Sequence, residues 1–589
     1  MALYQHHYFW QESTGGRLTY LRAVLHVVPT PFFRPFYCIF LFLFFFGGRS
    51  VFAAPTDTSR NVIVNILSAK NSYGMQTDSG LLQRLVENVQ LQQGTTTMTC
   101  DSAYLNLLTN NMEAFGNVHI VQSGGTQVSS DYLRYTGNKK LAYLKGNVSL
   151  TDGKNNLWSE DLTYDLNSKI GIYTNGGTLE SDATTLSSNA GSYNTQSKDA
   201  RFKGEVLVND PKYNVTSDDL GYNTNSKVVT FYGPSVVTND KSELRTSSGV
   251  YDSKNEIAHF SSRSSMQQDA QYIEGDKIDY NRVTGFGKAT GNVIVIDTSK
   301  KSTMWSGYAT YNEIDKRLFA TKKPVLLNVN GKDSLYIAAD TFYSAPDQRK
   351  QSVLAQDSTK ILSNKNLSKS EKRKIPFQQK KESDSATIRD QQTTPADSTV
   401  PRYFIGYHHV RIWSDSLQGL CDSISYSQRD SVMKMMGKPV AWSRESQITG
   451  DTILLYVDTS SIKRLFVPNN ALVVSRSGPV KAQLFDQVQG KTLTGYFTKN
   501  KLDYMVVFPS AESIYYSKDD NDAYLGVVQA EGERMKVFFE DSKIKKILIE
   551  QEPKQKLTPM SKANLPTMRL SRFQWLQDKR PKGKEELFH

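Results

Sequence analysis

The sequence predicts an all-β fold, an elongated solenoid of stacked short antiparallel strands. Three observations predict it: a tyrosine-containing phrase recurs at a fixed interval, polar turn residues separate alternating apolar and polar runs, and no helical periodicity is sustained between them. The composition agrees, because only 38% of the 589 residues are hydrophobic while 31 are Tyr, 27 are Phe and 37 are Gly. Such a mixture favours strands and turns over helices.

The length of the repeat can be read from the spacing of the tyrosines. Six tyrosines follow one another at intervals of 29 residues: Tyr135, Tyr164, Tyr193, Tyr222, Tyr251 and Tyr280. Tyr104 stands 31 residues before this series, and Tyr311 and Tyr343 continue it at intervals of 31 and 32 residues. A repeat of this length is typical of a stacked array in which each unit contacts its neighbours.

Each period follows the same order of elements. A short strand ends in the tyrosine, as in DLTY at 161–164, and a polar turn follows, as in DLNSK at 165–169. A second alternating strand comes next, as in LAYLKGNVSL at 141–150. This order predicts about three short strands per period. A glycine before Asn-Val, at Gly116, Gly146 and Gly291, allows the second strand to bend or bulge.

Alternation assigns the side chains to two faces. The apolar positions of both strands share one parity, so stacked copies form a continuous apolar inner surface and a polar outer one. The candidate lining residues of that surface are Leu133, Tyr135, Leu144, Val148, Leu150, Leu162, Tyr164, Phe202, Val206, Val208, Leu220, Tyr222, Ile278, Tyr280, Val293 and Val295. Two interpretations remain open at this point: a dry core filled by its own side chains, or a groove that holds fatty chains.

Residues 1–54 are expected to form an N-terminal extension and a signal peptide. After Arg34 the intensely apolar run PFYCIFLFLFFFGG precedes a small-residue site, so cleavage is expected near Ala53 or Ala54. The run is too short for a comfortable membrane span, which needs about 20 residues. We therefore expect an exported protein, with an uncleaved anchor as the alternative.

Motifs for catalysis are missing from the sequence: it has no phosphate-binding loop, nucleophile elbow or Cys/His zinc spacing. His408 and His409 are adjacent, so on a strand they would face opposite ways and would not share a metal. Cys100 and Cys421 stand in the similar phrases TCDSAY and LCDSIS, which predicts buried thiols at one structural position in two copies rather than a disulfide. These observations favour a non-enzyme with no cofactor and no metal.

The phrases themselves resemble a known family. CDSAYLNLLTNNMEAFGNVHIVQ at 100–122 and GNVSLTDGKNNLWSEDLTYD at 146–165 are similar to the repeated phrases of the OstA/LptA-type lipopolysaccharide transport family. The resemblance runs from about Asn61 to Asp347 and resumes from about Tyr403 to Ile549. The ending RFQWLQDKRPKGKEELF also resembles that of long OstA-like proteins of Gram-negative bacteria.

The resemblance implies a β-jellyroll, an open V-shaped stack of strands (a β-taco) whose interior shelters the acyl chains of lipid A. It implies a periplasmic location, lipopolysaccharide as cargo, and edge-strand pairing with lipopolysaccharide-transport proteins of the inner and outer membranes. An end-to-end homo-oligomer is a further expected arrangement, and nucleic acid is not an expected partner. The repeat at Ala258–Asp269 lacks the Gly-Asn-Val phrase, which leaves the continuity of a groove there in question.

The expected organisation has five parts: 1–54, N-terminal extension and signal peptide; 55–350, OstA-like repeats; 351–401, a polar basic linker; 402–550, a second OstA-like β-block; and 551–589, a basic C-terminal tail. Phe573 and Trp575 are expected to dock the tail onto the last strands. The net charge of +12 and pI near 9.1 indicate an anionic partner, unless the basic leader and tail account for them. Rim residues such as Lys139, Lys140 and Lys145 are candidate contacts for an anionic headgroup.

Two other functions are weighed against lipid carriage. A structural or adhesive exported solenoid with a filled core would use the same period and the same parity. A polysaccharide-binding β-helix would need aromatic side chains on an outward face, and the tyrosines here fall on the apolar parity instead. The sequence therefore favours carriage on the strength of the resemblance, with the structural solenoid as the alternative.

Overall fold

The computed structural model describes residues 63–78, 80–330, 333–349, 400–458, 461–498, 501–519, 521–540 and 543–589. The expected signal peptide and nearly all of the expected linker lie outside these described residues. Within them every regular element is a β-strand or a short 3-10 helix, and the predicted all-β fold is confirmed. None of the described residues belongs to a helix long and apolar enough to cross a membrane.

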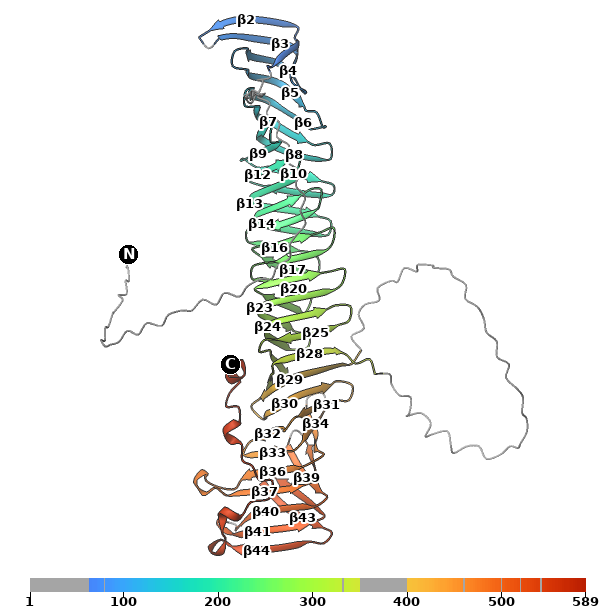
Figure 1. Ribbon diagram of the computed structural model, residues 1–589, viewed down its shortest axis with the longest axis vertical. Coiled ribbons are helices and arrows are strands. Elements are labelled where there is room, and N and C mark those ends of the chain that lie inside the picture. The colour runs from blue at the N-terminus through green and yellow to red at the C-terminus, as the bar shows by residue number, and fades with distance from the viewer. Residues whose placement is uncertain are drawn as a thin grey trace, which may run out of the picture. The chain divides into compact units, whose positions relative to one another are not determined.

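Strands from the first part of the chain are long near its start and alternate with short ones later (Figure 1). They are β1 (Asn65–Ser68), β2 (Asn71–Thr77), β3 (Gly80–Gln93), β4 (Thr96–Asn106), β5 (Asn111–Val121), β6 (Gln127–Thr136), β7 (Leu141–Thr151), β8 (Asn155–Asp165), β9 (Ile170–Tyr173), β10 (Gly177–Ser181), β11 (Thr184–Ser188), β12 (Ala190–Asn194), β13 (Asp199–Asp210), β14 (Tyr213–Asn223) and β15 (Val228–Phe231).

The middle of the chain continues the stack as far as residue 346. Its strands are β16 (Ser235–Thr238), β17 (Ser242–Thr246), β18 (Gly249–Asp252), β19 (Ile257–Phe260), β20 (Ser264–Gln268), β21 (Gln271–Gly275), β22 (Lys277–Asn281), β23 (Phe286–Asp297), β24 (Ser302–Asn312), β25 (Arg317–Thr321), β26 (Val325–Asn330), β27 (Asp333–Ala338) and β28 (Thr341–Pro346).

The last part of the chain adds sixteen strands and all five 3-10 helices of the described residues. The strands are β29 (Arg402–Trp413), β30 (Gln418–Ser427), β31 (Val432–Met436), β32 (Val440–Ser443), β33 (Ser446–Thr449), β34 (Thr452–Asp458), β35 (Ser461–Val467), β36 (Ala471–Arg476), β37 (Phe485–Gly490), β38 (Thr492–Thr498), β39 (Lys501–Phe508), β40 (Ala511–Lys518), β41 (Tyr524–Gly532), β42 (Arg534–Glu540), β43 (Lys543–Glu550) and β44 (Lys554–Pro559). The helices are η1 (Val480–Ala482), η2 (Met560–Lys562), η3 (Leu565–Thr567), η4 (Gln577–Lys579) and η5 (Lys584–Phe588).

Each period contains either two long bent strands or four short ones, so the prediction of about three short strands is wrong. β7 and β8 fill one period, and β9 to β12 fill the next. A long strand bends where a Gly-Asn pair takes positive φ, as at Gly146 (φ +79°) and Asn147 (φ +48°), and the register of pairing shifts at that point. This pair makes a bulge that turns the second half of the strand away from the first.

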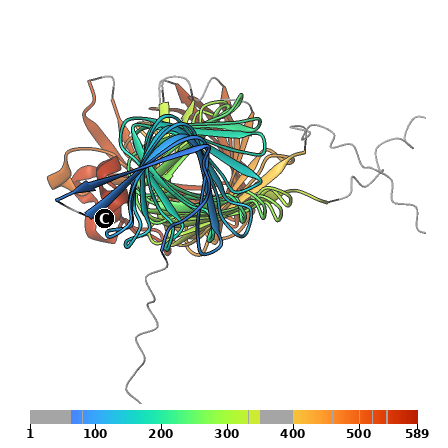
Figure 2. The same cartoon turned by 90° about the horizontal axis from the view of Figure 1, so that it is seen from above.

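The bends divide the stack into two facing layers, which Figure 2 shows from one end of the stack. We call layer A the half-strands that carry the repeated tyrosines, such as the second half of β8, and layer B the other half-strands, such as the first half of β8. β9 pairs with β8 in layer A, and β10 pairs with β8 in layer B. The bends close one side of the stack. On the opposite side the hairpin turns of the two layers meet along a line that we call the seam.

The repeated tyrosines alternate with small residues along layer A. Tyr164 lies between Ala142 and Gly171 in the strand register, and the next tyrosine, Tyr193, lies between Gly171 and Ala200. A large ring beside a small side chain fills the interior without overlap, because facing positions then have complementary volumes. The 29-residue period is therefore a packing repeat as well as a pairing repeat.

The two expected β-blocks are joined directly. β28 pairs with β29 from Thr341↔Tyr407 to Pro346↔Arg402, and β27 also pairs with β29. All 44 strands of the described residues form one hydrogen-bonded network, and these residues form one compact unit. Pairing extends past residue 550, because β44 pairs with β41.

The C-terminal tail returns along the outer face of layer B. Gln487 on β37 donates to the Met568 carbonyl and accepts from the Leu570 amide, at 3.0 and 2.9 Å. Gln447 on β33 makes the same pair of bonds further along the tail, and Arg411 on β29 donates to the carbonyl groups of the last residues. The tail therefore runs opposite to the order of the strands that it covers.

Phe573 and Trp575 dock the tail as expected, but not onto the last strands. They pack against Phe485 on β37, with ring centroids 5.3 and 4.9 Å apart, in a cluster that also contains residues of β36. β36 and β37 expose apolar side chains on the outside of layer B, and the aromatic rings of the tail cover them.

Candidate functional site

The interior between the two layers is lined by rows of apolar side chains that run along the stack, and one such row can be followed in each layer. In layer B the register aligns Leu91, Met98, Ile120, Val128, Leu150, Leu157, Leu179, Leu186, Val208, Val215, Val237, Leu244, Met266, Ile273, Val295, Met304 and Leu326. In layer A it aligns the tyrosines with Ala, Gly and Val as far as Tyr311, and then with Leu318. The predicted apolar inner surface is thus continuous across the Ala258–Asp269 repeat.

The sixteen residues predicted to line this surface all belong to one apolar cluster. Fourteen are buried, with exposures of 5% or less, and Tyr280 and Val295 are half-buried. Burial alone does not decide between a filled core and a lipid groove, so their role as lining residues stays a prediction. The burial does change along the stack, and that change divides the interior into two parts.

From β3 to β15 the interior is sealed. Leu91, Leu150, Leu186 and Val215 in layer B have exposures between 0 and 2%, and Tyr164 in layer A has an exposure of 0%. The four layer B residues lie between the bends and the seam, and Tyr164 lies next to the seam. The seam is therefore closed over this part of the stack.

Polar bonds across the seam close it. The Tyr164 hydroxyl donates to Gln122 Oε1 at 2.8 Å, and Tyr135 makes the corresponding bond to Gln93. Burial raises the pKa of both tyrosines, so their hydroxyl groups stay protonated and act as donors. Each pair joins a layer A strand to a layer B turn about one and a half periods earlier in the chain.

Charged pairs continue the same line. Tyr193 donates to Asp152, and Lys198 Nζ lies 2.6 Å from the same carboxylate, whose side chain is 1% exposed. Burial alone would raise the pKa of Asp152, but the hydrogen bonds from Lys198, Tyr193 and Asn155 outweigh it and lower that pKa well below its usual range. One period further on, Lys227 Nζ lies 2.6 Å from Asp182.

From β16 onward the interior is open at the seam. Val237, Leu244 and Ile273 in layer B are only half-buried, and so are Tyr251 and Tyr280 in layer A. Positions nearer the bends stay buried, and these are Phe231, Phe260, Ile278, Ala289, Val293 and Phe342. Because the side chains near the bends are buried and the apolar side chains toward the seam are half-exposed, this part of the interior is the candidate for an apolar groove whose mouth is the seam.

The sequence shows why the seam opens there. Lys198 and Lys227 occupy the last position of their turns with positive φ, and Glu256 takes the equivalent position in the next turn (φ +56°). By the spacing of the earlier pairs, Glu256 would face Asp210, and two carboxylates repel. Among the described residues from 228 to 349, no hydrogen bond or ion pair joins a layer A turn to a layer B turn. Tyr213 and Tyr251 form an edge-to-face pair across the seam at this point, with ring centroids 6.2 Å apart.

Residues beyond the prediction therefore line the open groove. The half-buried ones between β16 and β31 include Val237, Leu244, Tyr251, Met266, Ile273, Leu318, Leu326, Leu335, Phe404 and Met433. Their parity and their place in the period could have identified them. The 29-residue period alone does not indicate which part of the seam is closed.

The bends hold polar residues for structural reasons. Asn147 Nδ2 donates to Asp131 Oδ2 at 2.7 Å, and Asn117 and Asn292 make the equivalent bonds to Asp101 and Asp276. The repeated aspartate therefore fixes the bend, which agrees with its interpretation as a structural residue.

His408 and His409 occupy the equivalent bend of β29, with φ of 59° and 51°, rather than a regular strand. Their Nδ1 atoms lie 3.1 Å from Asp422 and 2.8 Å from Asp340, so each histidine has a different carboxylate partner. Among the described residues, no group of three or more His, Cys, Asp or Glu side chains is placed to hold a metal ion.

Cys100 and Cys421 lie at one structural position, as predicted. Each lies directly before the bend of its own strand and pairs with the valine that follows the bend of the preceding strand, in Val89↔Cys100 and Val410↔Cys421. Both thiols are free and buried, and burial raises the pKa of each to about 12. They are therefore protonated side chains of the apolar cluster rather than reactive nucleophiles.

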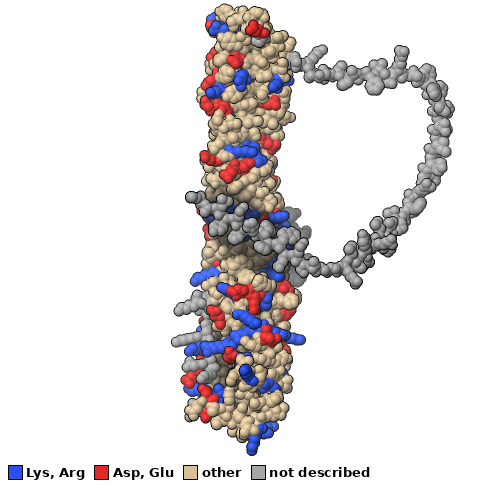
Figure 3. Space-filling model, turned by 90° about the vertical axis from the view of Figure 1, so that its left-hand side faces the viewer, with Lys and Arg blue, Asp and Glu red and all other residues tan. Residues whose placement is uncertain are grey.

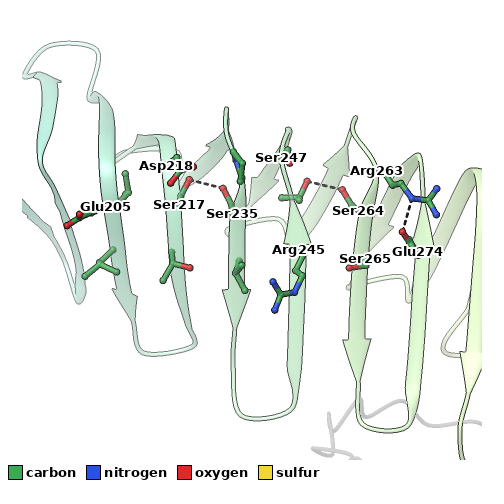
Figure 4. A pocket seen from close by; sticks show the side chains of 16 residues that line it. Glu205, Ser217, Asp218, Ser235, Arg245, Ser247, Arg263, Ser264, Ser265 and Glu274 are labelled. Carbon is green, nitrogen blue, oxygen red and sulfur yellow. Dashed lines mark hydrogen bonds and ion pairs between the residues drawn. The ribbon is translucent and has the colours of Figure 1, made fainter. Parts of the chain in front are cut away.

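A pocket of about 630 Å³ lies beside the bends between β13 and β21 (Figure 4). Its hydroxyl groups bond to one another, as in Ser217 to Ser235 at 2.7 Å and Thr246 to Ser264 at 2.8 Å. The Arg263 guanidinium is already paired with Glu274 and Asp276. The lining also includes apolar side chains such as Val206, so the pocket has a mixed character.

The outer surface carries both signs of charge. On the face shown in Figure 3, Lys and Arg are interspersed with Asp and Glu along the stack. Lys139 and Lys140 lie in a layer A turn at the seam, but Lys145 lies beside the bend at Gly146, on the opposite side of the stack. Lys145 therefore does not stand at the rim, contrary to expectation.

Fold and interior together define a class of protein: a β-jellyroll stack with two facing layers and a continuous apolar interior. Residues 63–218 match the family model described as OstA-like protein. The predicted resemblance to the OstA-like family is thereby confirmed over these residues.

One similar solved structure is LptH from Pseudomonas aeruginosa, described as the LptA-homologous periplasmic component of the conserved lipopolysaccharide transport device. It is 15% identical, the match covers 24% of this chain and 93% of that one, and the TM-score is 0.19. At that TM-score the likeness carries no conclusion about this chain. A search of curated proteins gave no match.

Proposed function

We propose that this protein is a periplasmic lipopolysaccharide carrier, which shelters the acyl chains of lipid A in the apolar groove and helps to move them from the inner to the outer membrane. The observation that carries the proposal is the groove from β16 to β31, with a buried floor and half-exposed apolar walls. The OstA-like match supports it from the sequence side. Neither a cofactor nor a catalytic step is part of this function.

The groove has the chemistry that an acyl chain requires. Phe260 and Ile278 are 5% exposed and form part of the floor, while Tyr280 and Leu318 form part of one wall. Burying one methylene group contributes about 0.8 kcal/mol, so a chain of roughly twelve carbons gains about 10 kcal/mol before the costs of ordering it. The sugar and phosphate groups of the lipid would stay outside the seam, in water.

Both ends of the stack offer edges for partners. Among the described residues, β2 pairs only with β3 and β44 only with β41, so each leaves one side of its backbone unpaired by them. An unpaired edge can add a strand from another chain, which would join this protein to transport proteins of either membrane or to a second copy of itself. Export through the expected signal peptide would place it in the periplasm.

Neighbouring residues on opposite faces of β25 provide the test. Leu318 faces the groove and packs against the apolar cluster, whereas Phe319 faces outward with 38% of its surface exposed. A photo-crosslinking residue at position 318 should capture lipopolysaccharide in cells, and the same residue at position 319 should not. Equal capture at both positions, or capture at neither in a folded and exported protein, would contradict the proposal.

The alternative is an exported structural solenoid with a filled core. The sealed interior from β3 to β15 favours it for that part of the stack, because side chains there already exclude solvent. A filled core throughout would leave position 318 unlabelled by lipid. The same crosslinking experiment therefore separates the two functions.

A further inference from the structure

The closed part of the seam suggests a device that the repeat alone does not require. We propose that the bonds from Tyr135, Tyr164, Tyr193, Lys198 and Lys227 across the seam form a latch. The latch confines bound acyl chains to the open groove from β16 to β31. Acyl chains pass toward the N-terminal end of the stack only where the bonds of the latch are broken. This proposal rests on the proposed function, because it concerns where that cargo sits.

The latch is built from buried polar groups placed over an apolar interior. Gln93 and Gln122 are 6 and 5% exposed, and each accepts a hydrogen bond from the tyrosine opposite. Gln93 also donates to the Gly137 carbonyl in a layer A turn at 3.1 Å. Parting the layers would leave these groups without partners until water reached them, so the closed state is favoured.

The charged end of the latch is its most specific part. Lys198 reaches back 46 residues to Asp152, and Lys227 reaches back by the same distance to the Ser181 hydroxyl at 3.0 Å and also to Asp182. Asp152 is shared between Lys198 and Tyr193, which ties β12 and the layer A turn that follows it to a single turn of layer B. The line of bonds stops at the turn that carries Glu256 instead of lysine.

The position of the latch has a consequence for loading. Lipid that enters at the open seam does so from the side of the stack, not from its N-terminal end. Acyl chains then meet sealed side chains at β15 and go no further while the latch is closed. Transit along the whole stack thus requires a change of conformation at residues 93–227.

The experiment places a diazirine analogue of leucine, close to leucine in size, at Leu162 in the sealed part or at Leu318 in the open part of the full-length chain. Purified lipopolysaccharide is the probe. We expect labelling at position 318 and about tenfold less at position 162. The variant Lys198→Glu places a carboxylate opposite Asp152, as Glu256 stands opposite Asp210, and it should raise labelling at position 162 about tenfold.

Lys203→Glu is the matched control, because Lys203 is an exposed residue beside a bend, away from the seam. It makes the same change of charge and should leave labelling at position 162 low. The reverse variant, Glu256→Lys, should extend the latch and lower labelling by a photo-residue at Leu244. Circular dichroism of each variant checks that it is folded.

The outcomes separate the two proposals. Labelling at neither position contradicts lipid carriage, whereas equal labelling at 162 and 318 in the unmodified protein overturns the latch and leaves carriage standing. Hydrogen exchange tests the latch without lipid: amides of β12 should exchange about tenfold faster in Lys198→Glu than in Lys203→Glu. Equal exchange in the two folded variants would also overturn the latch.

Discussion

Tyr164 serves packing with its ring and pairing with its hydroxyl group. The ring lies between Ala142 and Gly171 in layer A, and the hydroxyl crosses the seam to Gln122. An apolar residue could fill the same space, but only a side chain with a polar tip can also form a hydrogen bond with a buried amide. This double role accounts for tyrosine, rather than phenylalanine or leucine, at positions 135 and 164.

Asp486 gives a prediction at the residue scale. Burial raises the pKa of this carboxyl group to about 6, although it accepts a bond from the Tyr516 amide at 2.9 Å. The folded state therefore holds its proton more tightly than the unfolded chain does. Stability should fall as the pH rises from about 4 through 6, by about 3 kcal/mol for a shift of roughly two pH units.

Urea unfolding at pH 4 and pH 7 measures this effect, followed by tryptophan fluorescence, since Trp575 packs against the neighbouring Phe485. Asp486→Asn removes the titrating group and should remove this part of the pH dependence. If the variant and the unmodified protein lose stability equally over that range, Asp486 does not titrate as described.

At the scale of the element, the Gly-Asn bend is the feature that builds the two layers. Gly146 has φ of +79°, and a Cβ there would lie 2.6 Å from Asp131 Oδ2. Gly146→Ala should therefore destabilise the protein by about 2 to 3 kcal/mol, through backbone strain and the displacement of Asp131 from Asn147. Thermal or urea unfolding measures the loss.

Gly153 is the matched control for the bend. It also has positive φ (+87°), but a Cβ there would meet nothing within 4 Å. Gly153→Ala should show the strain alone, about 1 kcal/mol. An equal loss of stability in Gly146→Ala and Gly153→Ala would mean that the contact with Asp131 does not contribute to the cost of the substitution.

The C-terminal tail gives a second prediction for an element. Gln487 is fully buried and bonds the tail backbone at Met568 and Leu570. Gln487→Ala leaves those two backbone groups without a partner, at a cost of about 1 to 3 kcal/mol, and should loosen the tail. Trypsin should then cut faster after Arg569 and Arg572.

Gln555→Ala on β44 is the control, because that side chain is exposed. It should leave the rate of cleavage unchanged. A tail that stays equally resistant in Gln487→Ala would show that the aromatic contacts of Phe573 and Trp575 hold it without the glutamine.

For the whole molecule, the sequence predicted the stack and its inner surface because both are repeated every 29 residues. It did not predict the closed seam, because Lys198 and Asp152 lie 46 residues apart and their pairing depends on how periods are stacked. The direct pairing of β28 with β29 could not be predicted either, because more than fifty residues separate Pro346 from Arg402 in the sequence. Alternation identifies faces within a strand, but it does not give the register between distant turns.

The central claim is that the apolar interior carries the acyl chains of a lipid. Native mass spectrometry of the exported, purified protein, before and after delipidation, tests it most directly. We predict a folded protein whose mass falls on delipidation by the mass of one or more lipopolysaccharide molecules. An unchanged mass, in a protein that was folded and isolated from cells that make lipopolysaccharide, would contradict the claim.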